Sequence, residues 1–308
     1  MTDIERAVAV LRRGGLVAFP TETVYGLGAD ASNQQAVERI FSVKGRPAHH
    51  PLIVHLASAD EMPVWSPAAP PLAHRLAEAF WPGPLTILVP AGPPVADAVT
   101  GGRPTVGLRV PAHPVALGLL RAFAGGVAAP SANRFGRVSP TCAAHVRDDL
   151  GEDVDMVLDG GECAVGVEST IIDCTCDPPQ LLRAGGVTVE AITLVTGSTV
   201  APAAGLSRAP GMLDSHYAPR CRVVLAADAQ RAETIVEAER ARGRRAEVLD
   251  PGPDLDAYAH SLYSWLREAD ARGLAVLVVV PPPDTGLGVA INERLRKAAA
   301  PRPEDAGP

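Results

Sequence analysis

Strand-like and helix-like patterns alternate along most of this chain of 308 residues. Near the start, Ile4, Ala7, Val8 and Leu11 share one helical face, and the apolar run at 16–19 (LVAF) that follows is typical of a buried strand. The same alternation predicts further strands at 52–56, 85–89, 106–110 and 127–129, with helices after Ser32, at 71–80, after Pro114 and after Ser139. Such a succession favours a mixed sheet with helices packed on it.

The alternation is interrupted at residues 198–219 (STVAPAAGLSRAPGMLDSHYAP), where alanine, proline and glycine occur without a sustained period, as in a linker. From Cys221 it resumes with CRVVLA, AEVLD and LAVLVVV, which predicts a small, Rossmann-like parallel α/β unit. No glycine-rich phosphate fingerprint follows its first strand, so no dinucleotide site is expected there. We therefore predict a first domain at 1–197, a linker at 198–219 and a second domain at 220–308.

Overall charge restricts the classes of ligand. The net charge is −7 and the pI is near 5.6, so the chain as a whole is not attracted to nucleic acid or to an anionic membrane. Any anion must meet a local basic pocket. The apolar run at 274–280 is too short to cross a bilayer, and a cytoplasmic location is expected. Cys174 and Cys176 lack the spacing of a metal or redox pair, and the histidines form no metal-binding motif, so a protein-held metal is not expected.

The candidate chemistry lies in four loops of the first domain. They combine hydroxyls, amides and isolated basic groups directly beside predicted strands, and loops held by a rigid sheet concentrate binding residues. The four stretches are PTETVYGLG (20–28), KGRPAHHPL (44–52), APSANRFGRVSPT (129–141) and GVESTIID (166–173).

Two of these loops could bind phosphate. Lys44 and Arg46 could direct two cations at one polyphosphate, but taken alone they are more simply explained as cations at a helix C-terminus. Ser131 and Asn133 could donate to phosphate oxygens, and taken alone they more simply bond the turn that follows a strand.

Arg109 lies inside an apolar strand, where an unpaired guanidinium is costly. It must therefore meet either a ligand anion or a carboxylate, for which Glu168 is a candidate. Ser169, Thr170 and Arg183 likewise lie at strand ends. No nucleophile elbow or paired carboxylates occur in these motifs, so they describe a pocket for an anion and a small polar molecule.

The motifs PTETVYGLG, KGRPxxxPLIVH, FWPGPLT, RVPAHP, APSAN followed by SPT, GVESTIID and LLRAG occur in this order. Together they resemble the YrdC-type threonylcarbamoyl-AMP synthases. The stretch APGMLDSHYAP and the tail GLGVAINERLRKAA are similar to the long form of that family, which carries a C-terminal α/β domain. The resemblance implies a twisted mixed sheet with a concave basic pocket.

The resemblance also implies a reaction. L-threonine, bicarbonate and ATP, with Mg²⁺ expected on the nucleotide, would give threonylcarbamoyl-AMP and pyrophosphate. A downstream enzyme system would pass the threonylcarbamoyl group to tRNA beside the anticodon. The threonine site carried over by motif consists of Thr23, His55, Arg109, Ala129 and Ser169. The nucleotide site consists of Lys44 and Arg46, both also expected to be catalytic, with His50, Thr105, Ser131, Asn133, Ser139, Arg183 and Tyr217.

Some positions depart from the family pattern. His50 replaces a usual asparagine, which could make activity pH-sensitive, and Ala184 replaces a usual proline. In the linker, Leu213 and Ser215 replace basic residues, although residues 207–219 are still expected to form a lid. Gly26 and Gly28 are expected to let the backbone approach the ligand, whereas Glu22 and Tyr25 receive no role beyond a structural one.

Two alternatives compete with the synthase. One is a non-catalytic module that binds tRNA or double-stranded RNA, against which the acidic pI and the lack of interleaved aromatic and basic residues count. The other is a carbamoyl-adenylate transfer domain like those of hydrogenase maturation proteins, whose accompanying zinc-finger and acylphosphatase-like sequences do not occur here.

Overall fold

The computed structural model describes residues 1–204 and 217–301. These residues form two compact units. Residues 1–135 and 139–204 make the first unit, and residues 136–138 and 217–301 make the second. Each unit has its own sheet. The predicted boundaries at 197 and 219 remain predictions.

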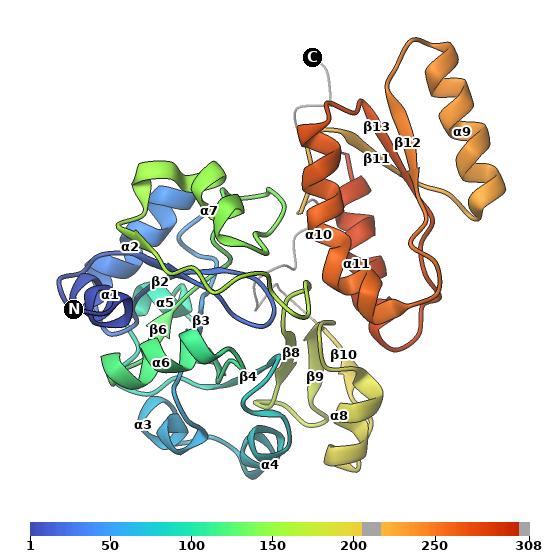
Figure 1. Cartoon of the computed structure of the whole chain (residues 1–308). Coiled ribbons are helices and arrows are strands. Elements are labelled where there is room, and N and C mark those ends of the chain that lie inside the picture. The colour runs from blue at the N-terminus through green and yellow to red at the C-terminus, as the bar shows by residue number, and fades with distance from the viewer. Residues whose placement is uncertain (205–216, 302–308) are drawn as a thin grey trace. The chain divides into compact units, whose positions relative to one another are not determined.

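The first unit is built on a sheet of ten strands in the order β10-β9-β8-β4-β5-β3-β6-β2-β1-β7 (Figure 1). Parallel and antiparallel pairs are mixed: β3 runs parallel to β5, while β4 runs antiparallel to it. The strands are β1 (Val17–Phe19), β2 (Gly26–Asp30), β3 (Ile53–His55), β4 (Leu85–Pro90), β5 (Thr105–Arg109), β6 (Val127–Ala128), β7 (Met156–Val157), β8 (Thr170–Asp173), β9 (Gln180–Arg183) and β10 (Ala201–Pro202). The predicted mixed α/β sheet is confirmed.

Helices pack on both faces of this sheet around β1. In β1, Ala18 packs into the core that contains α2, whereas Val17 and Phe19 pack into the core formed with α1 and α6. The helices are α1 (Asp3–Arg12), α2 (Gln34–Lys44), α3 (Met62–Trp65), α4 (Pro71–Phe80), α5 (Asp97–Thr100), α6 (Pro114–Phe123), α7 (Ala143–Leu150) and α8 (Val189–Thr196), with 3₁₀ turns at η1 (Ala59–Glu61) and η2 (Gly151–Asp153).

Two predicted helix starts are wrong, in each case because the predicted cap serine is bonded to a carboxylate. The N-cap of α2 is Asn33, whose side chain accepts from the Ala36 amide at 3.1 Å, because Ser32 is bonded to the Asp30 carboxylate instead. Helix α7 begins at Ala143 and not at Ser139, whose hydroxyl donates to Glu168 at 2.6 Å. Ser139 is therefore part of the loop network and not a helix cap.

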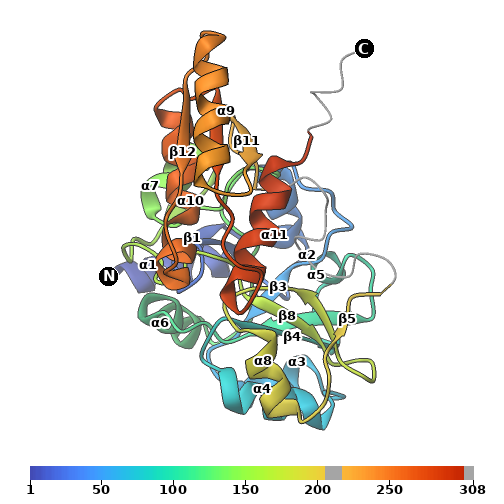
Figure 2. The same ribbon diagram turned by 90° about the vertical axis from the view of Figure 1, so that its right-hand side faces the viewer.

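The second unit is a parallel sheet of three strands in the order β11-β13-β12. The strands lie between α9 on one side and α10 with α11 on the other (Figures 1 and 2). Its elements are β11 (Arg222–Leu225), α9 (Ala229–Ala241), β12 (Ala246–Leu249), α10 (Leu255–Ala271), β13 (Val276–Val279) and α11 (Leu287–Ala299). This confirms the predicted small parallel α/β domain.

The segment Gly136–Val138 belongs to the second unit although its sequence neighbours belong to the first. The Ala218 amide donates to the Gly136 carbonyl at 3.0 Å, and Arg267 donates to the Val138 carbonyl. Within residues 1–204 and 217–301, no helix combines the length and apolar character that a membrane crossing requires.

Candidate active site

The residues predicted to bind threonine follow the order of six adjacent strands. Ser169 precedes β8, Arg109 ends β5, His55 ends β3, Ala129 follows β6 and Thr23 precedes β2. Thr86 of β4, which sequence reasoning missed, completes the series between β8 and β5. We call Thr23, Thr86, His55, Arg109, Ala129 and Ser169 the strand cluster. All of its side chains are buried.

Arg109 forms a buried ion pair with Glu22, with Nη2 and Oε1 2.8 Å apart and both side chains less than a tenth exposed. The contact is an ion pair without aligned hydrogen-bond geometry. Arg109 Nε donates to the Gly83 carbonyl at 3.2 Å, and Glu22 Oε2 accepts from the Ala112 amide at 3.0 Å. Glu168, the candidate partner named from the sequence, is therefore not the residue that pairs with Arg109; its carboxylate accepts from Ser139. The signal for Glu22 was its position as the one acidic residue in the loop behind a buried strand.

His55 lies beside Arg109 in the register between β3 and β5. Burial, reinforced by the positive charge of Arg109, lowers the pKa of His55 to about 3, so the ring is neutral at neutral pH. Its edge contacts the Phe19 ring at a centroid distance of 5.7 Å. Among the described residues, the buried Nδ1 atom has no hydrogen-bond partner. This atom is available to a polar group of a ligand.

Ser169 is held on two sides. Its hydroxyl lies 2.8 Å from that of Thr86, and Arg183 Nη2 donates to the same hydroxyl at 3.0 Å. Arg183 also donates to the Ser169 carbonyl from Nε at 3.0 Å and from Nη2 at 2.9 Å. The structure therefore places Arg183, predicted for the nucleotide, directly against a residue predicted for threonine.

Lys44 organises the loop that carries Ser131 and Asn133. Its ammonium donates to the Ser131 carbonyl at 2.6 Å and to the Asn133 carbonyl. Burial, with a smaller contribution from Arg46, lowers the pKa of Lys44 well below its usual value. The chain turns at Gly45, whose φ of 63° in the left-handed region suits glycine.

Arg46 and His50 meet at Phe135. The Arg46 guanidinium carbon lies 5.8 Å from the centroid of the Phe135 ring, and Arg46 Nη2 donates to the Pro51 carbonyl at 3.1 Å. The His50 ring centroid is 5.7 Å from that of Phe135. Burial and then Arg46 lower the pKa of His50 to about 4. We call Lys44, Arg46, His50, Ser131, Asn133 and Phe135 the loop cluster. Sequence reasoning missed Phe135.

The opening stretch PTETVYGLG is fixed by its own side chains. The hydroxyls of Thr21 and Thr23 lie 2.7 Å apart, and that of Thr21 donates to the Val24 carbonyl at 2.7 Å. Tyr25 donates to the Gly161 carbonyl at 2.8 Å, and burial raises the pKa of its hydroxyl to about 12.

The two glycines lie in β2, where a Cβ at Gly28 would come within 2.8 Å of Phe19 and within 2.7 Å of Val127. Neighbouring protein side chains are thus sufficient to require a small residue at Gly28, and the close approach of a ligand to this backbone remains a prediction.

The remaining predicted residues divide between the units. Ala129 donates its amide to the Ile53 carbonyl at 2.9 Å, and Thr105 begins β5. Tyr217 belongs to the second unit, where its ring stacks on Tyr263 at 5.7 Å and lies 5.6 Å from the Arg294 guanidinium. Tyr217 therefore belongs to a different unit from the other predicted site residues. Leu213, Ser215 and most of the expected lid lie outside the described residues.

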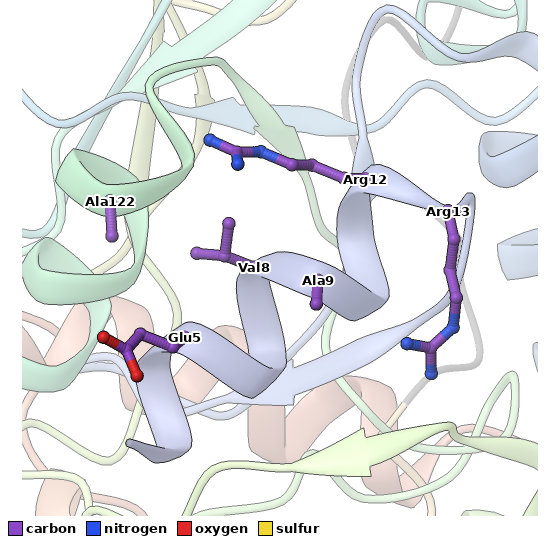
Figure 3. A pocket seen from close by; sticks show the side chains of 6 residues that line it. All are labelled: Glu5, Val8, Ala9, Arg12, Arg13 and Ala122. Carbon is purple, nitrogen blue, oxygen red and sulfur yellow. The ribbon is translucent and has the colours of Figure 1, made fainter. Parts of the chain in front are cut away.

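A depression of about 550 Å³ is lined by residues of α1 with Arg13 and by Ala122 of α6 (Figure 3). Val8 and Ala122 form its apolar sides, with Glu5 and Arg12 at its ends. It contains none of the predicted site residues. Among the described residues, no group of three or more His, Cys, Asp or Glu side chains could hold a metal ion.

Comparisons with known proteins cover nearly the whole chain. The family model Sua5_yciO_yrdC, described as "Telomere recombination", matches residues 9–185, and Sua5_C, described as "Threonylcarbamoyl-AMP synthase, C-terminal domain", matches residues 187–300. The threonylcarbamoyl-AMP synthase of Pyrococcus abyssi is 41% identical over 96% of this chain and 94% of its own. That of Bacillus subtilis is 40% identical over 97% of this chain and 94% of its own.

A solved structure supports the same family assignment. The crystal structure of P. abyssi Sua5 complexed with L-threonine matches with a TM-score of 0.92 and 40% identity, over 96% of this chain and 94% of that one. Both the sequence and the fold therefore match along the two units. The chain belongs to the Sua5/YciO/YrdC family, in the form that carries the Sua5 C-terminal domain.

Proposed function

We propose that this chain is a threonylcarbamoyl-AMP synthase, a nucleotidyltransferase that joins L-threonine, bicarbonate and ATP and releases pyrophosphate. The relatives of nearly equal length carry that name, and a structural neighbour was solved with L-threonine. The observation that carries the proposal for this chain is the strand cluster, in which a buried cation and hydroxyls from adjacent strands form one polar site inside an apolar sheet.

The strand cluster suits an amino acid. We assign Arg109 to the threonine carboxylate, with Glu22 and the Gly83 carbonyl fixing the direction of the guanidinium. Ser169 is oriented by Thr86 and Arg183, so its hydroxyl has a defined direction for a polar contact with threonine. The neutral His55 ring adds a nitrogen that bonds to no residue within 1–204 and 217–301, and it adds no second positive charge.

The loop cluster suits the polyphosphate. Lys44 shapes the loop by bonding two of its carbonyls, so we assign it the positioning of Ser131 and Asn133. Arg46 is then the cation assigned to direct contact with ATP, with its plane set by Phe135 and the Pro51 carbonyl. His50 is neutral near pH 7, so it can act there as a hydrogen-bonding group and not as a charge.

The chemistry requires no protein nucleophile. The deprotonated amine of threonine adds to bicarbonate with loss of water, which forms a carbamate. A carbamate oxygen then bonds to the α-phosphorus of ATP while the bond to pyrophosphate breaks. Such a site works by holding the reactants in line and by stabilising developing negative charge. Mg²⁺, when bound, would neutralise the phosphates, and we propose that it is held mainly by phosphate oxygens.

The product is an activated adenylate that water can hydrolyse. We propose that a downstream enzyme system transfers its threonylcarbamoyl group to an adenosine beside the tRNA anticodon, which places the reaction in the cytoplasm. Neither the strand cluster nor the loop cluster supplies an observation that favours one of the two alternative functions over the synthase. Family membership and the names of the relatives instead favour the synthase.

Replacing Arg46 by alanine tests the assignment of the loop cluster. Turnover should fall by about 10²–10³-fold, the usual effect of losing a group that stabilises transition-state charge, while the melting temperature stays near that of the parent. The matched control is Arg39→Ala on α2, the helix that ends just before Arg46; the exposed ion pair of Arg39 with Asp155 contributes little to stability. Full activity of the Arg46→Ala protein would refute the role.

A further inference from the structure

The edge of the second unit's sheet where its strands begin carries a group of arginines. Arg222, Ala246 and Val276 are in register at the starts of β11, β12 and β13, which defines this amino edge. Helix α9 ends here, and a short turn leads into β12, at one end of the unit in both views (Figures 1 and 2). We call this surface the arginine edge; it consists of Arg222, Arg240, Arg242, Arg244 and Arg245.

Three of these arginines share one carboxylate. Glu239, with a side chain only 5% exposed, lies 2.9 Å from Arg222, 3.0 Å from Arg242 and 3.0 Å from Arg244. The three guanidinium side chains are each more than half exposed. Glu239 thus fixes the directions of three cations but offsets the charge of only one.

The other two arginines add charge without adding a carboxylate. Arg240 Nε donates to the Ala246 carbonyl at 3.1 Å, and Arg245 forms no ion pair with any described residue. The neighbouring Glu247 pairs with Arg272. These side chains line a depression of about 400 Å³ formed by Arg240, Gly243, Arg244, Arg245, Ala246, Glu247 and Leu274. The edge is therefore strongly basic in a chain whose net charge is −7.

Helix stabilisation explains only part of this arrangement. Cations in the last turn of α9 interact favourably with its dipole, which accounts for Arg240 and Arg242. Arg222 comes from a strand, and Arg244 and Arg245 follow the helix end. Holding five like charges together costs free energy, so their convergence calls for an anionic partner.

The surroundings favour a phosphate backbone over other anions. Small-molecule sites of parallel sheets form at the carboxyl ends of the strands, and this is the opposite edge. No large apolar side chain of the described second unit is exposed, so the edge lacks the apolar anchor typical of a protein interface. Guanidinium groups match phosphate oxygens in forked pairs, and phosphate contacts need no aromatic residues.

We propose that the arginine edge docks the phosphate backbone of RNA, without reading its bases. That the RNA is tRNA rests on the proposed function, because tRNA receives the threonylcarbamoyl group.

The test measures binding of a fluorescein-labelled, unmodified tRNA transcript to the full chain by anisotropy over a range of salt concentrations. The variant Arg242→Gln/Arg245→Gln leaves Arg222 and Arg244 on Glu239, so the buried carboxylate keeps its partners. We expect about tenfold weaker binding. The salt slope, which is the slope of the logarithm of the binding constant against the logarithm of the salt concentration, should become smaller by about 2, one per lost phosphate contact. Arg245→Gln alone breaks no ion pair with the described part of the chain, and it should lower the salt slope by about 1.

The matched control is Arg231→Gln, an exposed arginine in the first turn of the same helix, which should bind like the parent. Pyrophosphate release without tRNA should be the same in all four proteins, so failure of docking and failure of the synthase proposal are distinguishable. The docking proposal is overturned if the parent does not bind the transcript at physiological salt, or if the double variant keeps its affinity and slope. A competition experiment gives a further test, in which polyglutamate and a DNA duplex of equal charge each displace the transcript. The docking proposal is also overturned if the two competitors are equally effective, because the edge would then be a site for acidic protein.

Discussion

At the scale of single residues, the buried charges carry most of the information. The sequence predicted that Arg109 must meet an anion, because a guanidinium inside an apolar strand cannot stay unpaired. It could not distinguish Glu22 from Glu168, since both lie beside strands and only the sheet order decides which is near. Thr86 and Phe135 were missed because a threonine in a strand and a phenylalanine in a loop give no chemical signal of their own.

Glu22→Gln tests the buried ion pair. The glutamine can still accept from the Ala112 amide, but Arg109 loses its counter-charge, so the free energy of unfolding should fall by about 3 kcal/mol. If Arg109 binds the threonine carboxylate, saturating L-threonine should restore more stability to this variant than to the parent. Urea unfolding with and without threonine measures both effects.

The control for this variant is Glu38→Gln, an exposed carboxylate bonded to Gln34 on α2, which should change stability by less than about 0.5 kcal/mol. Equal unfolding midpoints for the Glu22→Gln protein and the parent would contradict a stabilising pair.

At the scale of elements, the sequence predicted where strands occur but not which strands lie next to one another in the sheet. Apolar runs identify β3, β4 and β5 because each is buried on both faces. Their order in the sheet depends on contacts between distant segments, which no local pattern encodes. The two wrong helix starts have a different origin, because side-chain carboxylates compete for the serines: Asp30 bonds Ser32 and Glu168 bonds Ser139, so neither serine caps a helix.

Gly28→Ala tests the packing of β2. The added methyl would lie 2.7 Å from Val127 and 2.8 Å from Phe19, so the free energy of unfolding should fall by about 1–3 kcal/mol. For Gly118→Ala in α6 the free energy of unfolding should instead rise by about 0.5–1 kcal/mol, because helix propensity improves and the added methyl would lie in ordinary contact with Ile4 at 3.8 Å. A denaturant midpoint for Gly28→Ala at or above that of the parent would refute the packing explanation.

At the scale of the whole molecule, the interruption of the alternating pattern predicted two α/β parts, and the structure has two units, each with its own sheet. The sequence could not indicate that Gly136–Val138 groups with the second unit, since nothing in the loop's composition sets these residues apart. The net charge of the chain also gave no indication of the local basic surface. An acidic total argued against nucleic acid, yet the arginine edge concentrates positive charge on one surface.

The central claim is that one chain consumes threonine, bicarbonate and ATP together. The most direct test is pyrophosphate release from ATP by the full chain, with threonine and then bicarbonate omitted in turn. The proposed synthase should release pyrophosphate only when both are present, because the carbamate that attacks the α-phosphorus is built from them. Pyrophosphate release that continues at the same rate when threonine is omitted, or when bicarbonate is omitted, would contradict the proposal.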